Sequence, residues 1–371
     1  MQQRSQTMQA GKNEKAILAG ADLGRRSENF EDAMEELKGL TETAGGEVIA
    51  TLVQAREKLD HVTYIGSGKL QELKHLADEL EPDVIIFDRE LTPVQLRNLE
   101  AALDFRVVDR TMLILDIFSQ RARSSEGKLQ VELALLEYRL PRLIGKGADM
   151  SRLGAGIGTR GAGEQKLELD RRYIRRRIQT IKKKLDQVQK TRDLQRRQRY
   201  RTGIKTVSLV GYTNAGKSTL FNALCQVGHR SGNQQAEADG RLFQTLDTTI
   251  RKIHLPSRRE ILLTDTVGFI QNLPPHLLAA FRSTLEEAVD ADLLLQVADM
   301  SDPNYLEKMM VVEEILSELG ADKNRILTVF NKADRLDQPS LSAGGPVISA
   351  LTGQGIGALL EQVDALLETQ D

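Results

Sequence analysis

Short apolar runs alternate with amphipathic segments in the first third of the chain. The apolar runs predict three strands, at residues 15–23, 48–53 and 83–87. Apolar positions that recur every three or four residues predict three helices, at residues 27–43, 69–80 and 93–103. Because strands and helices alternate, residues 15–122 are expected to form a small α/β domain with parallel strand pairing.

The periodicity becomes helical from about residue 126. One apolar face, which includes Val131, Leu135 and Tyr138, predicts a helix that stops at Pro141. A later helix carries apolar residues at alternating spacings of four and three, at Ile174, Ile178, Ile181, Leu185 and Val188. We favour packing of these two helices on each other over a coiled coil with a partner. Residues 123–202 are therefore expected to form an antiparallel helical hairpin whose tip is the glycine-rich segment 143–163.

The remainder, residues 203–371, again alternates strand-like and helical patterns. The strand-like runs are at residues 206–210, 261–264, 293–297, 326–330 and 347–348. This order is typical of a doubly wound sheet, which binds ligands at the C-terminal ends of its strands. The predicted fold class is therefore α/β throughout, with the helical hairpin inserted between two α/β domains.

Composition and charge reduce the number of functional classes that the chain can belong to. Of the 371 residues, 40% are hydrophobic and 28% are charged, which excludes a disordered tail. Aromatic residues make up only 4% and tryptophan is absent, which argues against a carbohydrate platform or recognition mainly by base stacking. Residues 171–201 hold 14 Lys or Arg and two Asp, a local charge of +12, so the rest of the chain carries −14. Such a basic element suggests a phosphate-rich partner at one location.

Several other sequence features are expected to have structural roles and not catalytic or binding roles. The single cysteine, Cys225, cannot form an internal disulfide and is expected to be a packing residue in a reducing cytoplasm. No run approaches the roughly 18 apolar residues of a membrane span, and the five histidines lack metal-ligand spacing. Residues 66–69 (GSGK) resemble a phosphate loop, but Thr63 and Leu70 break its pattern, so an ordinary turn before a helix is expected.

Residues 211–218 (GYTNAGKS) fit the phosphate-loop pattern G-x-x-x-x-G-K-[ST]. They lie between a predicted strand and a predicted helix, where backbone N–H groups and the helix N-terminus attract phosphates. Lys217 is expected to reach the β- and γ-phosphates, and Ser218 to ligate Mg²⁺. The next strand ends in Asp265, which can hold the metal through its water shell, and the N–H of Gly268 can sense the γ-phosphate.

A later strand leads into Asn331-Lys332-Ala333-Asp334. Asp334 can accept hydrogen bonds from N1–H and the exocyclic amine of guanine, and adenine offers neither donor, so this carboxylate selects GTP over ATP. The backbone N–H of Ala350, which follows Ser349, would donate a hydrogen bond to guanine O6. Four elements in this order, each ending a predicted strand, predict a Ras-like P-loop GTPase domain that converts GTP and water to GDP and phosphate.

The polar stretch at residues 243–249 (FQTLDTT) lacks clear periodicity and lies where a mobile switch loop belongs. One of its threonines should close the Mg²⁺ shell when GTP is bound. Thr245, Thr248 and Thr249 all qualify, and residue chemistry alone does not choose among them.

The chain resembles the HflX family of ribosome-associated GTPases from about Glu35 onward. The segments that carry the resemblance are the GTPase motifs and residues 130–134 (QVELA), 151–161 (SRLGAGIGTRG), 243–249 and 265–274 (DTVGFIQNLP). The resemblance implies a GTP cycle coupled to the large ribosomal subunit, with members that split idle or stalled ribosomes. It also implies that Thr245 is the Mg²⁺ ligand. Thr248 stands where members often carry proline, so switch stiffness is expected to differ.

Catalysis by such a site is positional and electrostatic. Phe269 occupies the position where many related GTPases place a water-orienting glutamine, and a phenyl ring cannot orient water by hydrogen bonding. We therefore expect slow turnover that a partner accelerates; the alternative is that Phe269 is a core residue and Gln271 acts. Asn214 matches the asparagine of GTPases in which K⁺ supplies positive charge, although a loop-stabilising role is an alternative.

The complete expected site is as follows. Nucleotide-binding residues are Gly211, Tyr212, Thr213, Asn214, Ala215, Gly216, Lys217, Ser218, Thr219, Phe243, Gln244, Thr245, Leu246, Asp247, Asp265, Thr266, Val267, Gly268, Asn331, Lys332, Ala333, Asp334, Ser349 and Ala350. The metal ligands are Ser218, Thr245 and Asp265, and the catalytic residues are Lys217, Asn214 and Phe269.

The expected ligands are GTP or GDP, Mg²⁺ and K⁺, and the expected partner is the large ribosomal subunit and its RNA, bound through hairpin 123–202 by a monomer. Arg152 and Arg160 lie among the glycines of the tip, where they can pair with phosphates and stack on bases. Two other classes of function fit the sequence less well. A small-molecule kinase does not need the guanine-selecting motif at residues 331–334, and an RNA-binding structural protein would release no phosphate.

Overall fold

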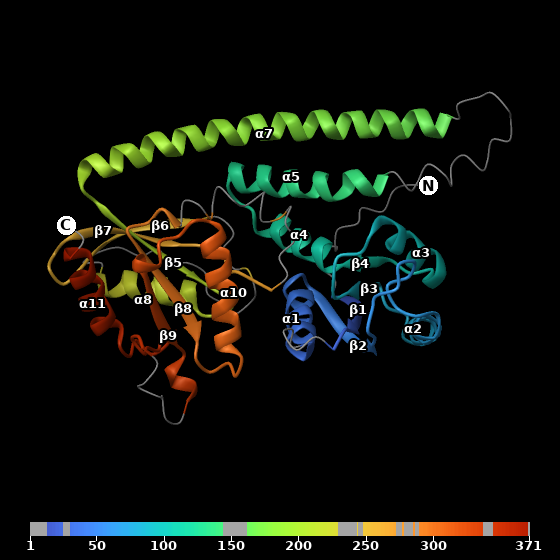
Figure 1. The fold of residues 1–371 in the computed structure, drawn as a ribbon, viewed down its shortest axis with the longest axis horizontal. Coiled ribbons are helices and arrows are strands. Elements are labelled where there is room, and N and C mark those ends of the chain that lie inside the picture. The colour runs from blue at the N-terminus through green and yellow to red at the C-terminus, as the bar shows by residue number, and fades with distance from the viewer. Residues whose placement is uncertain are drawn as a thin grey trace. The chain divides into compact units, whose positions relative to one another are not determined.

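The computed structural model describes residues 13–24, 30–143, 162–228, 248–271, 289–336 and 344–369, together with Phe243, Leu277 and Leu285 (Figure 1). The chain divides into two compact units, each with its own sheet. The first comprises residues 1–120 and 129–184, and the second comprises residues 121–128 and 185–371. Within the described residues, no helix has both the length and the apolar character needed to cross a membrane.

The first unit is built on a four-stranded parallel sheet of order β2-β1-β3-β4. Its strands are β1 (Glu14–Asp22), β2 (Gly46–Ala55), β3 (Val84–Phe87) and β4 (Val107–Asp109). Its helices are α1 (Phe30–Thr43), α2 (Ser67–Leu80), α3 (Pro93–Leu103) and α4 (Arg110–Arg121). Central strand β1 is buried along most of its length, because helices cover both faces of a parallel sheet.

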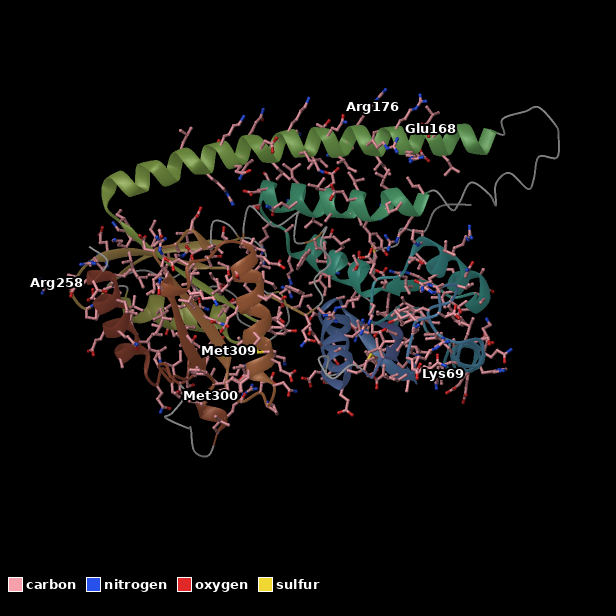
Figure 2. The ribbon with its side chains drawn as sticks, in the orientation of Figure 1. Lys69, Glu168, Arg176, Arg258, Met300 and Met309 are labelled. Carbon is pink, nitrogen blue, oxygen red and sulfur yellow. The ribbon has the colours of Figure 1, made fainter. Side chains whose placement is uncertain are left out.

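The three strands and three helices predicted for this region are confirmed within a few residues, and the ordinary helix start at residues 66–69 is confirmed as well. Gly66 is the N-cap of α2, and Lys69, labelled in Figure 2, pairs with Glu72 of the same helix at 2.8 Å. Strand β4 and helix α4 were not predicted. Helix α4 is buried from Arg110 to Phe118, so it has no polar stripe to reveal a helical period.

Two long helices, α5 (Ser125–Arg142) and α7 (Ala162–Thr202), run side by side (Figure 1). Ile178 and Ile181 of α7 are buried, and Arg177 and Lys182 of α7 form ion pairs with Glu132 and Glu137 of α5, so packing of the two arms is confirmed. The predicted stop at Pro141 is wrong by one residue. A proline in the last turn removes only one helical hydrogen bond, so α5 continues through it to Arg142. The tip, with Arg152 and Arg160, lies outside the described residues.

The last residue of α5 is anchored to the sheet of the first unit. The Arg142 guanidinium stacks on the ring of Tyr138 at 3.4 Å and donates hydrogen bonds to the carbonyl of Leu91 at 2.7 Å and the carboxylate of Asp109 at 3.4 Å. Since planar guanidinium groups hold several partners in a fixed geometry, this contact fixes where α5 ends and the tip segment begins.

The second unit contains a five-stranded sheet of order β6-β7-β5-β8-β9, parallel except for the antiparallel pair β6 and β7. Its strands are β5 (Lys205–Gly211), β6 (Thr249–His254), β7 (Glu260–Asp265), β8 (Leu293–Asp299) and β9 (Ile326–Asn331). Its helices are α8 (Lys217–Gly228), α10 (Tyr305–Glu318), α11 (Ile356–Glu368) and the 3₁₀ turns η2 (Lys323–Arg325) and η3 (Ala333–Arg335). Helix α8 packs its apolar face against this sheet through Leu220, Phe221 and Leu224.

The predicted doubly wound α/β sheet is confirmed, with two differences. The edge strand β6 was not predicted, because Arg251, Lys252 and His254 interrupt its apolar pattern. The run predicted as a strand at residues 347–348 forms only an isolated bridge, between Val347 and Phe330. Both differences lie at the margins of the sheet, and the strand ends that carry the candidate site are the predicted ones.

Candidate nucleotide-binding site

The loop between β5 and α8, residues 211–218, is shaped by two glycines in conformations that other residues rarely adopt. Gly211 has a φ of +148° and Gly216 a φ of +91°. A Cβ atom on Gly211 would lie 2.4 Å from the carbonyl oxygen of Val297, and one on Gly216 would lie 2.2 Å from Asn331 Nδ2. Only glycine permits these approaches, so the loop can wrap closely around a ligand.

Lys217 begins α8 and its side chain is buried. Its ammonium group donates to the backbone carbonyls of Gly211 at 3.0 Å and Tyr212 at 2.7 Å, which draws the side chain across the loop. Burial lowers the pKa of this lysine to about 8, while the Asp265 carboxylate acts in the opposite direction. A cation with this little hydration is well suited to phosphate oxygens, because their negative charge would offset the cost of burial.

Ser218 and Asp265 meet at the N-terminus of α8. The Ser218 hydroxyl donates to Asp265 Oδ2 at 2.8 Å, and both side chains are buried. The adjacent Thr266 hydroxyl donates to the Leu209 carbonyl at 2.6 Å, which holds the end of β7 against β5. A hydroxyl and a carboxylate are hard oxygen ligands of the kind Mg²⁺ prefers, so this pair fits a magnesium site.

The segment after β7 packs directly on the phosphate loop. Thr213 N donates to the Phe269 carbonyl at 2.7 Å, and Phe269 N donates to the Gly211 carbonyl at 3.1 Å. A Cβ atom on Gly268 would lie 2.8 Å from Thr213 Cγ2 and 2.9 Å from Lys217 Nζ, so only glycine fits here. Among the described residues the buried Thr213 Oγ1 has no hydrogen-bond partner, which is a polar atom a phosphate could satisfy.

Phe269 lies beside the loop through its backbone, but its ring is buried. Burial is what the alternative interpretation expects of a packing residue. Gln271, the other candidate, donates its backbone N–H to the Tyr212 hydroxyl at 2.8 Å. This tether between the second loop residue and the segment that follows β7 was not expected, since only the Gly, Lys and Ser positions of the loop pattern have roles that can be inferred from sequence.

The guanine motif is tied to the phosphate loop by Asn331. Its Nδ2 donates to the Ala215 carbonyl at 2.9 Å, and its Oδ1 accepts from Ala350 N at 2.9 Å. The N–H expected to serve guanine O6 therefore bonds to Asn331 in this structure, and guanine would have to share or displace that bond. Asp334 accepts a hydrogen bond from Ser349 Oγ, which orients its carboxylate.

Two residues of this region escaped the sequence analysis. Asp299, at the end of β8, pairs with Lys332 at 2.6 Å and so holds that lysine, which has a left-handed φ of 66°. Leu351 is 77% exposed directly after Ala350. The sequence signal that could have been used is a leucine directly after the expected O6 donor, because an apolar side chain there can cover the face of a flat base.

The other expected residues fall into two groups. Within the described part of the second unit, Val267, Ala333 and Phe243 are buried, Thr219 is half-buried on α8, and Asn214 is exposed with a left-handed φ of 61°. Gln244, Thr245, Leu246 and Asp247 lie outside the described residues. The role of Thr245 as a metal ligand therefore remains an expectation.

Together these elements define a P-loop GTPase, and comparison with known proteins agrees. Residues 206–332 match the family described as 50S ribosome-binding GTPase. Residues 31–119 match the family described as GTP-binding GTPase N-terminal, and residues 121–199 that described as GTP-binding GTPase Middle Region.

Curated relatives identify the family. GTPase HflX of Caldanaerobacter subterraneus subsp. tengcongensis is 52% identical over 335 residues, which cover 90% of this chain and 77% of that protein. GTPase HflX of Escherichia coli K12 is 41% identical over 344 residues, covering 91% and 79% respectively. The chain therefore belongs to the HflX family of GTPases, and it is a GTP hydrolase. A crystal structure described as the SsGBP and GDP complex is similar as well, with 26% identity, a TM-score of 0.53 and coverage of 96% of this chain and 99% of that one.

Proposed function

We propose that this GTPase is a Mg²⁺-dependent switch that binds the large ribosomal subunit and couples its GTP cycle to ribosome splitting, rescue or biogenesis, as a cytoplasmic monomer. The observation that carries the proposal is a nucleotide site in the same chain as a long helix with an exposed basic surface. The family description that residues 206–332 match, which names 50S ribosome binding, points to the same partner.

The basic surface is what remains after α5 has neutralised part of α7. Arg177 forms a bidentate pair with Glu132 at 2.6 and 2.8 Å, and Lys182 pairs with Glu137 at 2.8 Å. By contrast, other cations of α7 are exposed and form no ion pair with any described residue, namely Arg175, Arg176, Lys183, Lys184 and Lys190. Arg176 points away from α5 (Figure 2). Exposed cations without an ion-pair partner along one long helix fit the phosphate backbone of RNA.

The nucleotide site supports a positional mechanism. Mg²⁺ would be held by Ser218 and Asp265, with Thr245 completing the set, and would supply charge neutralisation for the phosphates. Lys217 stabilises negative charge on the phosphates. Because the ring of Phe269 is buried and cannot orient water, hydrolysis by the isolated chain should be slow, and contacts with the ribosome should fix the switch segments and accelerate it.

Hydrolysis is expected to be faster in K⁺ than in Na⁺, with Asn214 as the residue responsible. Asn214 is exposed on the phosphate loop, where its amide oxygen can ligate a monovalent cation. Asn214→Ala should therefore erase the difference between the two salts. Asn214→Gly is the matched variant. It removes the same amide as Asn214→Ala, but glycine adopts the left-handed backbone of this position without strain. Equal rates in K⁺ and Na⁺ for the unmutated protein, with and without ribosomes, would refute this role.

The tip is expected to transmit ribosome binding to the nucleotide site. Replacing both Arg152 and Arg160 with alanine should leave GTP binding intact and abolish ribosome-stimulated hydrolysis, since the change removes cations that pair with RNA but touches no nucleotide ligand. Phosphate release with and without ribosomes measures the effect. Arg325→Ala, at an exposed site of the second unit, is the control. Full stimulation of the double variant would exclude the tip from this role.

A further inference from the structure

The exposed surface of α7 carries an aromatic ring as well as positive charge. Tyr173 is 69% exposed. Three of the other tyrosines, Tyr64, Tyr138 and Tyr212, are buried, and each is engaged by a polar or charged group. Burying an aromatic ring is favourable in general, so a tyrosine held in solvent on a rigid helix is a candidate contact for a partner.

The charges around this ring select the kind of partner. Arg176 and Arg177 lie three and four residues after Tyr173 and therefore on its side of the helix, as does Asp170 three residues before it. Arg172 is the preceding residue, and Arg175 lies on the opposite side. Arg177 is paired with Glu132 and Arg172 with Glu168, whereas Arg175 and Arg176 form no ion pair with any described residue. A basic protein surface would be repelled here and a neutral one would gain nothing from these charges, so charge complementarity favours a polyanion.

A nucleic acid can contact both the arginine side chains and the exposed ring of this surface. Arginine side chains take phosphate oxygens, and an exposed ring takes the face of a base, provided that the base is not already stacked inside a duplex. We infer that Tyr173 stacks on an unpaired base of RNA while Arg176, one turn further along the same side of α7, holds a neighbouring phosphate. The inference rests on the proposed function, in which the hairpin binds ribosomal RNA, and it adds the class of nucleotide that α7 recognises.

The salt dependence of binding separates the ring from the charges. Binding of the full chain to isolated large subunits, with a non-hydrolysable GTP analogue, is measured at two salt concentrations. Tyr173→Ala should weaken binding by about 5- to 100-fold at both concentrations, and Tyr173→Phe should retain it, because phenylalanine keeps a stacking face. Arg176→Ala should instead flatten the salt dependence. Leu194→Ala, a similarly exposed apolar position of α7, should change neither.

A spectroscopic test identifies the occupant directly. The chain has no tryptophan, so Tyr173→Trp introduces a single tryptophan at the site, which can be excited selectively over the remaining tyrosines. A short single-stranded RNA should quench this tryptophan, and duplex RNA and heparin, which offer charge without an unpaired base, should not. Leu194→Trp is the control and should respond equally to all three probes.

These measurements distinguish a failure of ribosome binding from a failure of base stacking by Tyr173. If the unmutated chain fails to bind large subunits at either salt concentration, the proposed function is wrong. If it binds and Tyr173→Ala binds equally well, or if heparin quenches the Tyr173→Trp protein as strongly as single-stranded RNA does, the stacking inference alone is wrong. A Tyr173→Phe variant as weak as Tyr173→Ala would also overturn it, since stacking needs no hydroxyl.

Discussion

Asp334→Asn should convert a GTP-specific site into one that prefers xanthosine nucleotides. The Asp334 carboxylate would accept hydrogen bonds from the two donors of guanine, whereas an asparagine amide would present a donor to the carbonyl that xanthine carries in place of the exocyclic amine. The loss of GTP affinity is expected to be roughly 3 kcal/mol, or about 100-fold, the range for a polar group left unpaired in a closed site. Titration of the variant with GTP and with xanthosine triphosphate measures both changes.

The structure supplies the controls for this exchange. Asp322→Asn alters an exposed carboxylate of the same unit and should leave both affinities unchanged. Ser349→Ala removes the hydroxyl that donates to Asp334, so it should weaken GTP binding without creating a preference for xanthosine. If the Asp334→Asn protein still preferred GTP, the guanine site would have been assigned to the wrong carboxylate.

Asn331→Ala is expected to lower both the stability of the second unit and its nucleotide affinity. The Asn331 side chain is buried and bridges the Ala215 carbonyl and the Ala350 N–H, at 2.9 Å each. Truncation leaves two buried backbone groups without their partner, at a cost of about 2–4 kcal/mol in the free energy of unfolding. Urea unfolding of the nucleotide-free protein, followed by a probe in the second unit, measures this loss.

Replacing a second asparagine shows whether the loss of stability comes from the Asn331 bridge or from any Asn-to-Ala change. Asn324 lies in the same unit with an exposed side chain, so Asn324→Ala should cost less than about 0.5 kcal/mol. Nucleotide affinity should fall only in the Asn331 variant, because, of these two side chains, it is Asn331 that ties the guanine motif to the phosphate loop. Equal stability of the two variants would show that the bridge contributes nothing.

The nucleotide site could be predicted from sequence because its chemistry is fixed by order and spacing. Gly211, Gly216 and Gly268 occupy positions where a Cβ atom would collide with neighbouring atoms, so a pattern that requires glycine at such positions records a structural constraint. Asp265 and Asn331 each end a buried strand. Because parallel strands bring their C-terminal ends to one edge, a sequence that predicts the strands also predicts the neighbours.

Contacts that depend on tertiary packing could not be predicted. The pairs Arg177–Glu132 and Lys182–Glu137 need the register between two helices, which a heptad stripe alone does not specify. The sequence therefore overstated the free charge of α7, since acidic residues of α5 neutralise part of it. The tether from Tyr212 to Gln271 also needs the fold, because a tyrosine at a variable position of the loop pattern carries no signal of its partner.

Sedimentation tests whether the nucleotide controls the interaction of this GTPase with the large ribosomal subunit. The protein is centrifuged with separated large and small subunits in GTP, GDP and a non-hydrolysable GTP analogue, and the bound fraction is measured in each case. We expect cosedimentation with large subunits in the analogue, release in GDP, and little association with small subunits. Binding that is the same in all three nucleotides, or that favours the small subunit, would contradict this expectation.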